Sequence, residues 1–167
     1  MLTSTRIHVA SLLLLSACVD SEPPDSALAP EPIGDMLRQL EGARGECSTN
    51  RLYRSGALVQ YQCFDTNERF VSETRGTLLP SAEQELDAQL TSVDFDATEP
   101  VNYMGACGLA DAHGIVTLGV EDERVSFDVF CPPEGVAELY GQLEELVLEL
   151  QACEEPLAHL ASIESGC

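Results

Sequence analysis

Alternating apolar and polar side chains along much of the chain predict β-strands. The clearest case is residues 51–64, where three apolar residues alternate with Gln60 and Gln62. The dipeptide Ser55-Gly56 supplies a turn inside this segment. A period of two places alternate side chains on opposite faces of a strand, so the segment predicts an antiparallel hairpin. Further strands are predicted over residues 68–74, 101–106, 115–120 and 124–130.

Apolar residues spaced three and four apart predict helices. Residues 81–84 have the form of a capping box, ahead of an apolar stripe that reaches Val93. The cleanest stripe follows Pro133 and predicts a helix of about 17 residues. This stripe consists of Val136, Leu139, Tyr140, Leu143, Leu146, Val147 and Leu150. Short helices are also predicted over residues 33–40 and 154–163.

The order of these elements predicts the fold class. Three strands and a helix over residues 47–93 are followed by three strands and a helix over residues 101–153. Strands joined as antiparallel hairpins, with helices packed on one face of the sheet, make an α+β domain. Residues 84–90 and 137–143 share a local pattern, which suggests a duplicated βββα unit. We therefore predict a disulfide-stapled α+β fold with two possible βββα repeats.

The N-terminal segment has a different pattern. Residues 9–15 are an apolar run of seven after a polar start that carries Arg6. Such a run is too short to cross a bilayer as a helix and is typical of a cleaved signal, here residues 1–17. Residues 18–32 are rich in proline and acidic residues, which predicts a disordered tether. The compact domain is then expected over residues 33–167.

The apolar run ends in Leu15-Ser16-Ala17-Cys18, which resembles the lipobox of bacterial lipoproteins. The resemblance covers only the start of the chain, to about residue 20. It implies cleavage before Cys18, a diacylglycerol on its thiol and acylation of the new amine, and several acyl chains together hold a protein stably on a membrane. In the lipoproteins of enteric bacteria an aspartate directly after the cysteine favours the inner membrane, and the residue here is Val19. The outer membrane is therefore the favoured location. An ordinary secretory signal, with Cys18 as an incidental thiol, is the alternative.

An exported chain with an even number of remaining cysteines predicts disulfide bonds. The six are Cys47, Cys63, Cys107, Cys131, Cys153 and Cys167. The predicted hairpin brings the first two close together, and the last two bracket the predicted C-terminal helix. We favour sequential pairing, although three bridges allow fifteen connectivities.

The charge of the chain excludes several classes of function. The sequence has 29 acidic residues against 8 basic ones, all of them arginine, and a formal net charge of −21. Nucleic acids and anionic headgroups both require a basic face, so we predict no nucleic-acid partner. The absence of lysine excludes a Walker phosphate loop and Schiff-base catalysis. The acidic residues keep the protein soluble. The alternative interpretation is that they form a surface that binds cations or a basic partner.

Few residues could carry chemistry. Only His113 and His159 remain once the signal is removed. His113 lies in a predicted loop, where a serine or acid brought near by folding could complete a small hydrolase site. The loop over residues 108–114, next to Cys107, could instead be presented to a protease by an inhibitor-like module. The cysteines and histidines lack the close pairs typical of zinc sites. The acids within residues 94–99 and 121–123 could bind calcium weakly, but such turns are typical of a solvated surface, so we predict no metal and no cofactor.

These observations together predict a non-catalytic lipoprotein of the bacterial cell envelope. Its anchor is the lipid on Cys18, and its domain binds an envelope protein or has a structural role. A hydrolase that uses His113 and a protease-inhibitor-like module are the alternatives.

Overall fold

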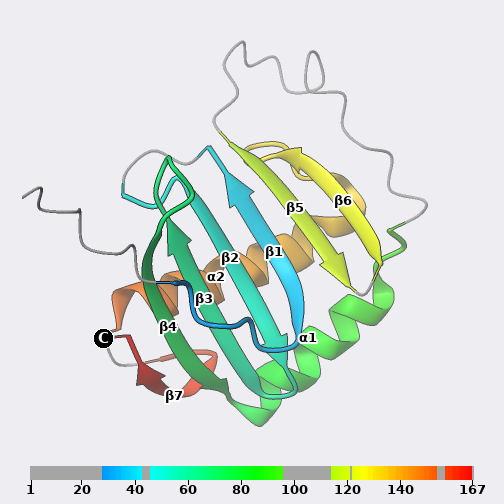
Figure 1. The fold of residues 1–167 in the computed structure, drawn as a ribbon. Helices are drawn as coiled ribbons and strands as arrows, with labels where there is room; N and C mark the ends of the chain where they lie inside the picture. Colours follow the sequence, from blue (N-terminus) through cyan, green and yellow to red (C-terminus); the bar gives the residue numbers. More distant parts are fainter. Residues whose placement is uncertain (1–27, 43–45, 96–113, 121, 154–156, 167) are drawn as a thin grey trace, which may run out of the picture.

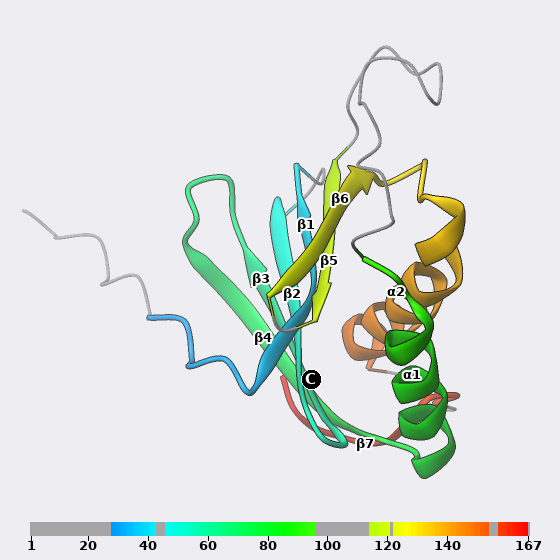
Figure 2. The same ribbon diagram turned by 90° about the vertical axis from the view of Figure 1, so that its right-hand side faces the viewer.

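The computed structural model describes residues 28–42, 46–95, 114–120, 122–153 and 157–166. Seven strands form one antiparallel sheet in the order β6-β5-β1-β2-β3-β4-β7. Two helices cover one face of this sheet, and none of the described residues forms a helix on the other face (Figure 1, Figure 2). In chain order the elements are β1 (Asp35–Glu41), β2 (Thr49–Ser55), β3 (Leu58–Phe64), β4 (Phe70–Leu78), α1 (Pro80–Ser92), β5 (Ile115–Val120), β6 (Glu123–Asp128), α2 (Ala137–Ala152) and β7 (Leu160–Ser165), with a short 3-10 turn (Glu134–Val136) before α2. The predicted α+β class is confirmed.

The hairpin of β2 and β3 forms as its alternating pattern predicts. The turn consists of Gly56 and Ala57, because Ser55 pairs with Leu58, and Gly56 has a positive φ of 59°. Asn50 pairs with Cys63, so Cys47 lies just beyond the end of the ladder. The disulfide Cys47–Cys63 closes there, with a Cα–Cα distance of 5.2 Å.

Residues 33–40 contribute a strand, β1, and the helix predicted there is wrong. The apolar spacing that resembles a helix comes from a β-bulge between Met36 and Arg38. A bulge inserts one extra residue into a strand, so consecutive residues can face the same side. Leu37 and Arg38 are both buried, with exposed fractions of 3% and 1%. β1 then pairs with β2 on one side and with β5 on the other, which places it near the centre of the sheet.

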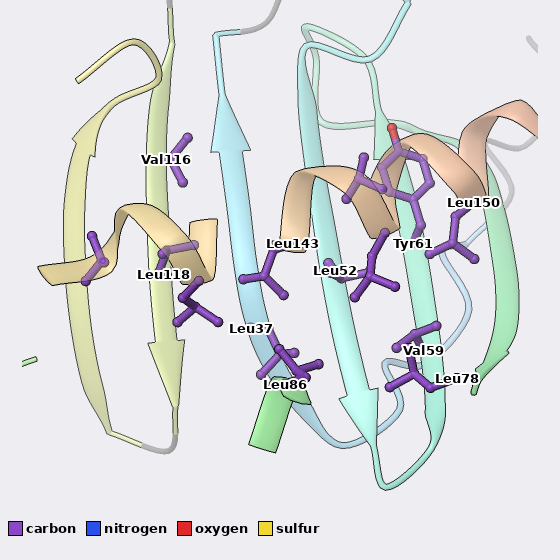
Figure 3. Close-up of a cluster of buried hydrophobic side chains, with 14 of the residues drawn as sticks. Leu37, Leu52, Val59, Tyr61, Leu78, Leu86, Val116, Leu118, Leu143 and Leu150 are labelled. Atoms are coloured by element: carbon purple, nitrogen blue, oxygen red, sulfur yellow. The ribbon is translucent and has the colours of Figure 1, made fainter. Parts of the chain in front are cut away.

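The helices bury the stripes that the sequence predicts. Figure 3 shows side chains of α1 and α2 against those of the sheet, with Leu86 and Leu143 facing Leu37 and Leu52. All residues of the α2 stripe belong to this core or pack against it. The predicted capping box is not formed: α1 starts at Pro80, and its N-cap, Leu79, makes no side-chain capping bond. Proline suits the first helical position because its fixed φ is already helical and its missing N–H is not needed there.

The C-terminal helix predicted over residues 154–163 is also wrong, because residues 160–165 form β7 on the outer edge of β4. The register of β7 shifts twice, between the partners Arg75 and Gly76 and between Thr77 and Leu78. These irregularities allow Leu160 and Ile163, three positions apart, both to reach the core. The last strand therefore carries a spacing of apolar residues that resembles a helical one.

The two predicted repeats share one sheet. β5 and β6 continue the sheet through β1 and contribute Val116, Leu118 and Phe127 to the same core as β2 to β4. The strand predicted over residues 101–106 lies outside the described residues. The duplication of a βββα unit therefore stays a prediction.

The entry into β7 is held by one carboxylate of α2. Glu149 accepts hydrogen bonds from the backbone N–H groups of Ala158, His159 and Leu160 at 3.0–3.2 Å, and it lies 2.8 Å from the Nδ1 atom of His159. Partial burial raises the pKa of Glu149, but the hydrogen bonds from the His159 ring and from the backbone N–H groups outweigh it and lower the pKa. The ionised carboxylate is therefore the form that the fold stabilises.

We expect Glu149→Gln to destabilise the domain by about 1–2 kcal/mol at neutral pH, because a charged acceptor of several hydrogen bonds is replaced by a neutral one. A lowered folded pKa stabilises the fold above the pKa of an unfolded glutamate, about 4.3. This contribution is lost as the pH falls through the folded pKa, so the difference between the two proteins should shrink below about pH 4.3. Urea unfolding at a series of pH values measures this difference in the free energy of unfolding. Glu138→Gln, an exposed acid on the same helix, is the control, and an equal loss in both variants would contradict the prediction.

Candidate functional site

A charged side chain is buried between the sheet and α2. Arg38 comes from β1 beside its bulge, and its side chain is only 1% exposed. Its Nη1 atom donates a hydrogen bond to Oδ1 of Asn50 on β2, and its Nη2 atom forms an ion pair with Oε1 of Glu144 on α2. A buried guanidinium is costly unless it is paired and hydrogen-bonded, so the two partners are what make this position tolerable.

Two tyrosines complete the polar cluster around Arg38. Burial, and then the nearby charge of Glu144, raise the pKa of Tyr140 to about 12, although Arg38 acts in the opposite direction. Tyr61 on β3 accepts a 2.6 Å hydrogen bond from the Nε2 atom of Gln151, and its hydroxyl lies 3.6 Å from Sγ of Cys47. Burial raises the pKa of Tyr61 as well. Both phenols therefore stay neutral and act as hydrogen-bonding groups at physiological pH.

A cavity of about 470 Å³ opens from this cluster to solvent, and we call it the Arg38 pocket. The polar part of its lining is Arg38, Asn50, Glu46, Glu144 and Gln151. The apolar part is Leu40, Cys47, Val147 and Leu148. The pocket lies between the β1–β2 end of the sheet and the C-terminal half of α2, so the disulfide Cys47–Cys63 forms part of its wall.

The accessible charges of the Arg38 pocket are negative. Glu46 is exposed and the side chain of Glu144 is 32% exposed, whereas the guanidinium of Arg38 is buried and already paired. Leu148 is 61% exposed at the rim and offers an apolar surface to an incoming group. This arrangement suits a ligand with a positive head and an aliphatic stem, because such a side chain buries its stem and keeps its charge beside polar groups.

A second cavity of about 520 Å³ lies at the opposite end of β2, against α1. Arg54 lines this cavity and contacts three groups. Its Nη1 atom lies 2.6 Å from Oδ1 of Asp87, its Nη2 atom lies 3.7 Å from Oε1 of Glu83, and its Nε atom donates a 2.7 Å hydrogen bond to the carbonyl of Gly56. These contacts tie α1 to the turn between β2 and β3. The arginine and its partners have a structural role there.

The residues singled out in the sequence are only partly described. Cys18, Cys107, Cys167 and residues 108–113 of the predicted loop, His113 among them, lie outside the described residues, so the sites and pairings that depend on them stay predictions. Cys131 and Cys153 are disulfide-bonded, like Cys47 and Cys63. His159 contacts Glu149 and, at 3.3 Å, Glu145, which is a structural position at the start of β7.

No group of three or more metal-ligating side chains occurs in the part of the chain that the structure describes. Within that same part, no helix is long and apolar enough to cross a membrane. The chain matches no protein-family model, and no curated protein or solved structure is significantly similar to it.

We expect Glu144→Leu to destabilise the domain by about 3 kcal/mol, because it leaves Arg38 buried without its counter-charge. The double variant Arg38→Met with Glu144→Leu should recover most of this loss, since it removes both charges and keeps their approximate volume. Urea unfolding of the two variants and of Glu138→Leu, an exposed position on α2, measures the effect. If Glu144→Leu is as stable as the control Glu138→Leu, the ion pair does not contribute to the stability of the fold.

Proposed function

We propose that this chain is a lipid-anchored protein of the bacterial cell envelope that binds a basic partner protein through the Arg38 pocket. The anchor is the lipid on Cys18, and the outer membrane is the favoured location. The domain itself carries out no chemistry in this proposal. The lipobox at residues 15–18 supports the anchor, and the charge of the chain supports the choice of partner.

The proposal depends on one observation above all: the solvent-facing part of the Arg38 pocket combines carboxylates with an apolar rim. Glu46 and Glu144 can pair with a guanidinium or ammonium group, and Asn50 and Gln151 offer neutral polar groups nearby. Leu148 and Val147 can pack on the aliphatic stem of the same side chain. An arginine or lysine of a partner protein fits this combination.

The overall charge favours the same kind of partner. Removal of the signal leaves seven arginines against 29 acidic residues. Such an excess attracts basic proteins, raises their association rate and repels acidic ones. The hydrolase and inhibitor alternatives depend on His113 and the loop around it, of which residues 108–113 lie outside the described residues, and no other observation favours them.

We expect Cys18→Ala to move the protein from the membrane fraction to the soluble fraction, because the lipid has no other attachment point in the proposal. Cell fractionation and the intact mass of both proteins measure this. The wild-type mass should include a lipid adduct on residues 18–167. Retention of the variant in membranes, or a wild-type mass without the adduct, would refute the anchor.

We expect Glu46→Gln to weaken binding of an arginine-rich partner about two- to fivefold, the effect of one exposed ion pair. A fluorescein-labelled hexa-arginine peptide serves as the probe, and fluorescence anisotropy at two salt concentrations gives the dissociation constants. Glu85→Gln removes the same charge from α1, away from the pocket, and is the matched control. If both variants lose the same affinity, the peptide binds through overall charge alone and the pocket has no special part.

A further inference from the structure

The face of the sheet that carries no helices contains two buried glutamines. Gln60 and Gln62 on β3 point away from the helices, because they alternate with the core residues Val59, Tyr61 and Cys63. Their exposed fractions are 0% and 1%, although side chains on the helix-free face of an antiparallel sheet are normally solvated. Something other than a helix therefore covers them.

The covering element is the segment that precedes β1. Figure 2 shows the chain before β1 running along the side of the sheet opposite to α1 and α2. We call residues 30–33 the docked segment. The Nε2 atoms of Gln62 and Gln60 donate hydrogen bonds to the carbonyls of Pro30 (2.8 Å) and Glu31 (3.2 Å). The backbone N–H of Ile33 donates in turn to Oε1 of Gln60 (2.8 Å).

These contacts form a specific site for an extended backbone. Both glutamine amides also donate to Oε2 of Glu73 on β4, at 2.8 and 3.4 Å, which fixes their orientation. The segment then bends into β1 at Gly34, which has a positive φ of 55°. A Cβ at this position would lie 2.2 Å from the carbonyl oxygen of Arg54, so only glycine allows the chain to pass so close.

The two sides of the sheet differ in charge. The helices carry seven acidic residues and no basic one: Glu83, Glu85 and Asp87 on α1, and Glu138, Glu144, Glu145 and Glu149 on α2. The helix-free face carries charges of both signs, among them Arg51, Arg75 and Arg124 and the acids Glu41 and Glu73, at register positions that alternate with core residues. Anionic headgroups therefore repel the helix layer more strongly than the helix-free face.

We infer that the docked segment orients the anchored domain, with the helix-free face toward the membrane and the helix layer, including the Arg38 pocket, away from it. This inference rests on the proposed lipid anchor at Cys18. A chain of twelve residues from Cys18 to Pro30 reaches roughly 40 Å at most, whereas the seventeen residues from Cys18 to Asp35 would reach roughly 60 Å. Docking thus shortens the tether and makes it leave the domain from the helix-free face.

The absence of lysine provides a direct test. Arg124→Lys places a unique side-chain amine on the helix-free face, and Gln84→Lys places one on the exposed side of α1. The full lipidated protein, labelled with an amine-reactive fluorophore, is reconstituted into vesicles of phosphatidylethanolamine and phosphatidylglycerol that contain a nitroxide-headgroup lipid. The probe at position 124 should be quenched more strongly than the probe at position 84. Equal or reversed quenching overturns the inferred orientation.

A second pair of variants tests the docked segment itself. Gln60→Met with Gln62→Met keeps the side-chain volume but removes the hydrogen bonds to the segment, so the difference in quenching should shrink and the Ile33 amide should lose its hydrogen-exchange protection. Gln39→Met changes another glutamine of the helix-free face, one that bonds to Glu41 and Arg51, and should preserve both readouts. An unprotected Ile33 amide in the wild-type protein overturns the docking.

The two proposals fail in distinguishable ways. A wild-type protein without a lipid adduct refutes the anchor and the orientation together. A lipidated protein with equal quenching at both positions refutes the orientation alone and leaves the proposed anchor and pocket intact.

Discussion

Burial of one apolar face of the sheet under α1 and α2 is the constraint on which the rest of the structure depends. The helices shield the leucines, valines and Phe127 on this face from water. Each fully buried side chain contributes about 1.5–3 kcal/mol to the stability of the fold. The helix-free face has no such requirement and can carry polar side chains. The disulfide Cys47–Cys63 then links the start of β2 to β3, and the Glu149 contacts link α2 to the start of β7.

The sequence predicts those parts of the fold in which the side-chain period is regular. The β2–β3 hairpin and the stripe of α2 have clean periods of two and of about 3.6, and both are confirmed. The two helices predicted wrongly, at residues 33–40 and 154–163, are replaced by strands with irregular registers. A bulge moves consecutive residues to the same face, which turns an alternating pattern into one with a spacing of three. Partners on neighbouring strands stabilise such a bulge, and a local pattern contains no information about them.

The candidate site was missed for the same reason. In a helix over residues 33–40, Arg38 would not join the apolar stripe and would be taken as a solvated residue. The bulge of β1 instead turns Arg38 into the core beside Leu37, where Asn50 and Glu144 compensate its charge. These partners come from β2 and α2, which lie 12 and 106 positions away in the sequence. No sequence spacing could have linked Arg38 to Glu144, because the contact exists only once α2 has packed on the sheet.

The two faces of the sheet therefore differ in composition for different physical reasons. The helix layer covers an apolar surface with its inner side and faces solvent with its outer side, where its acidic residues lie. The accessible charges of the Arg38 pocket, beside α2, are negative as well. The helix-free face must bind an extended segment without an apolar core, and it does so with amide side chains that match backbone carbonyls and an N–H group. The proposed function and the further inference give the two faces separate tasks, recognition of a partner and control of the tether. A single antiparallel sheet can serve both because alternate residues of each strand belong to different faces.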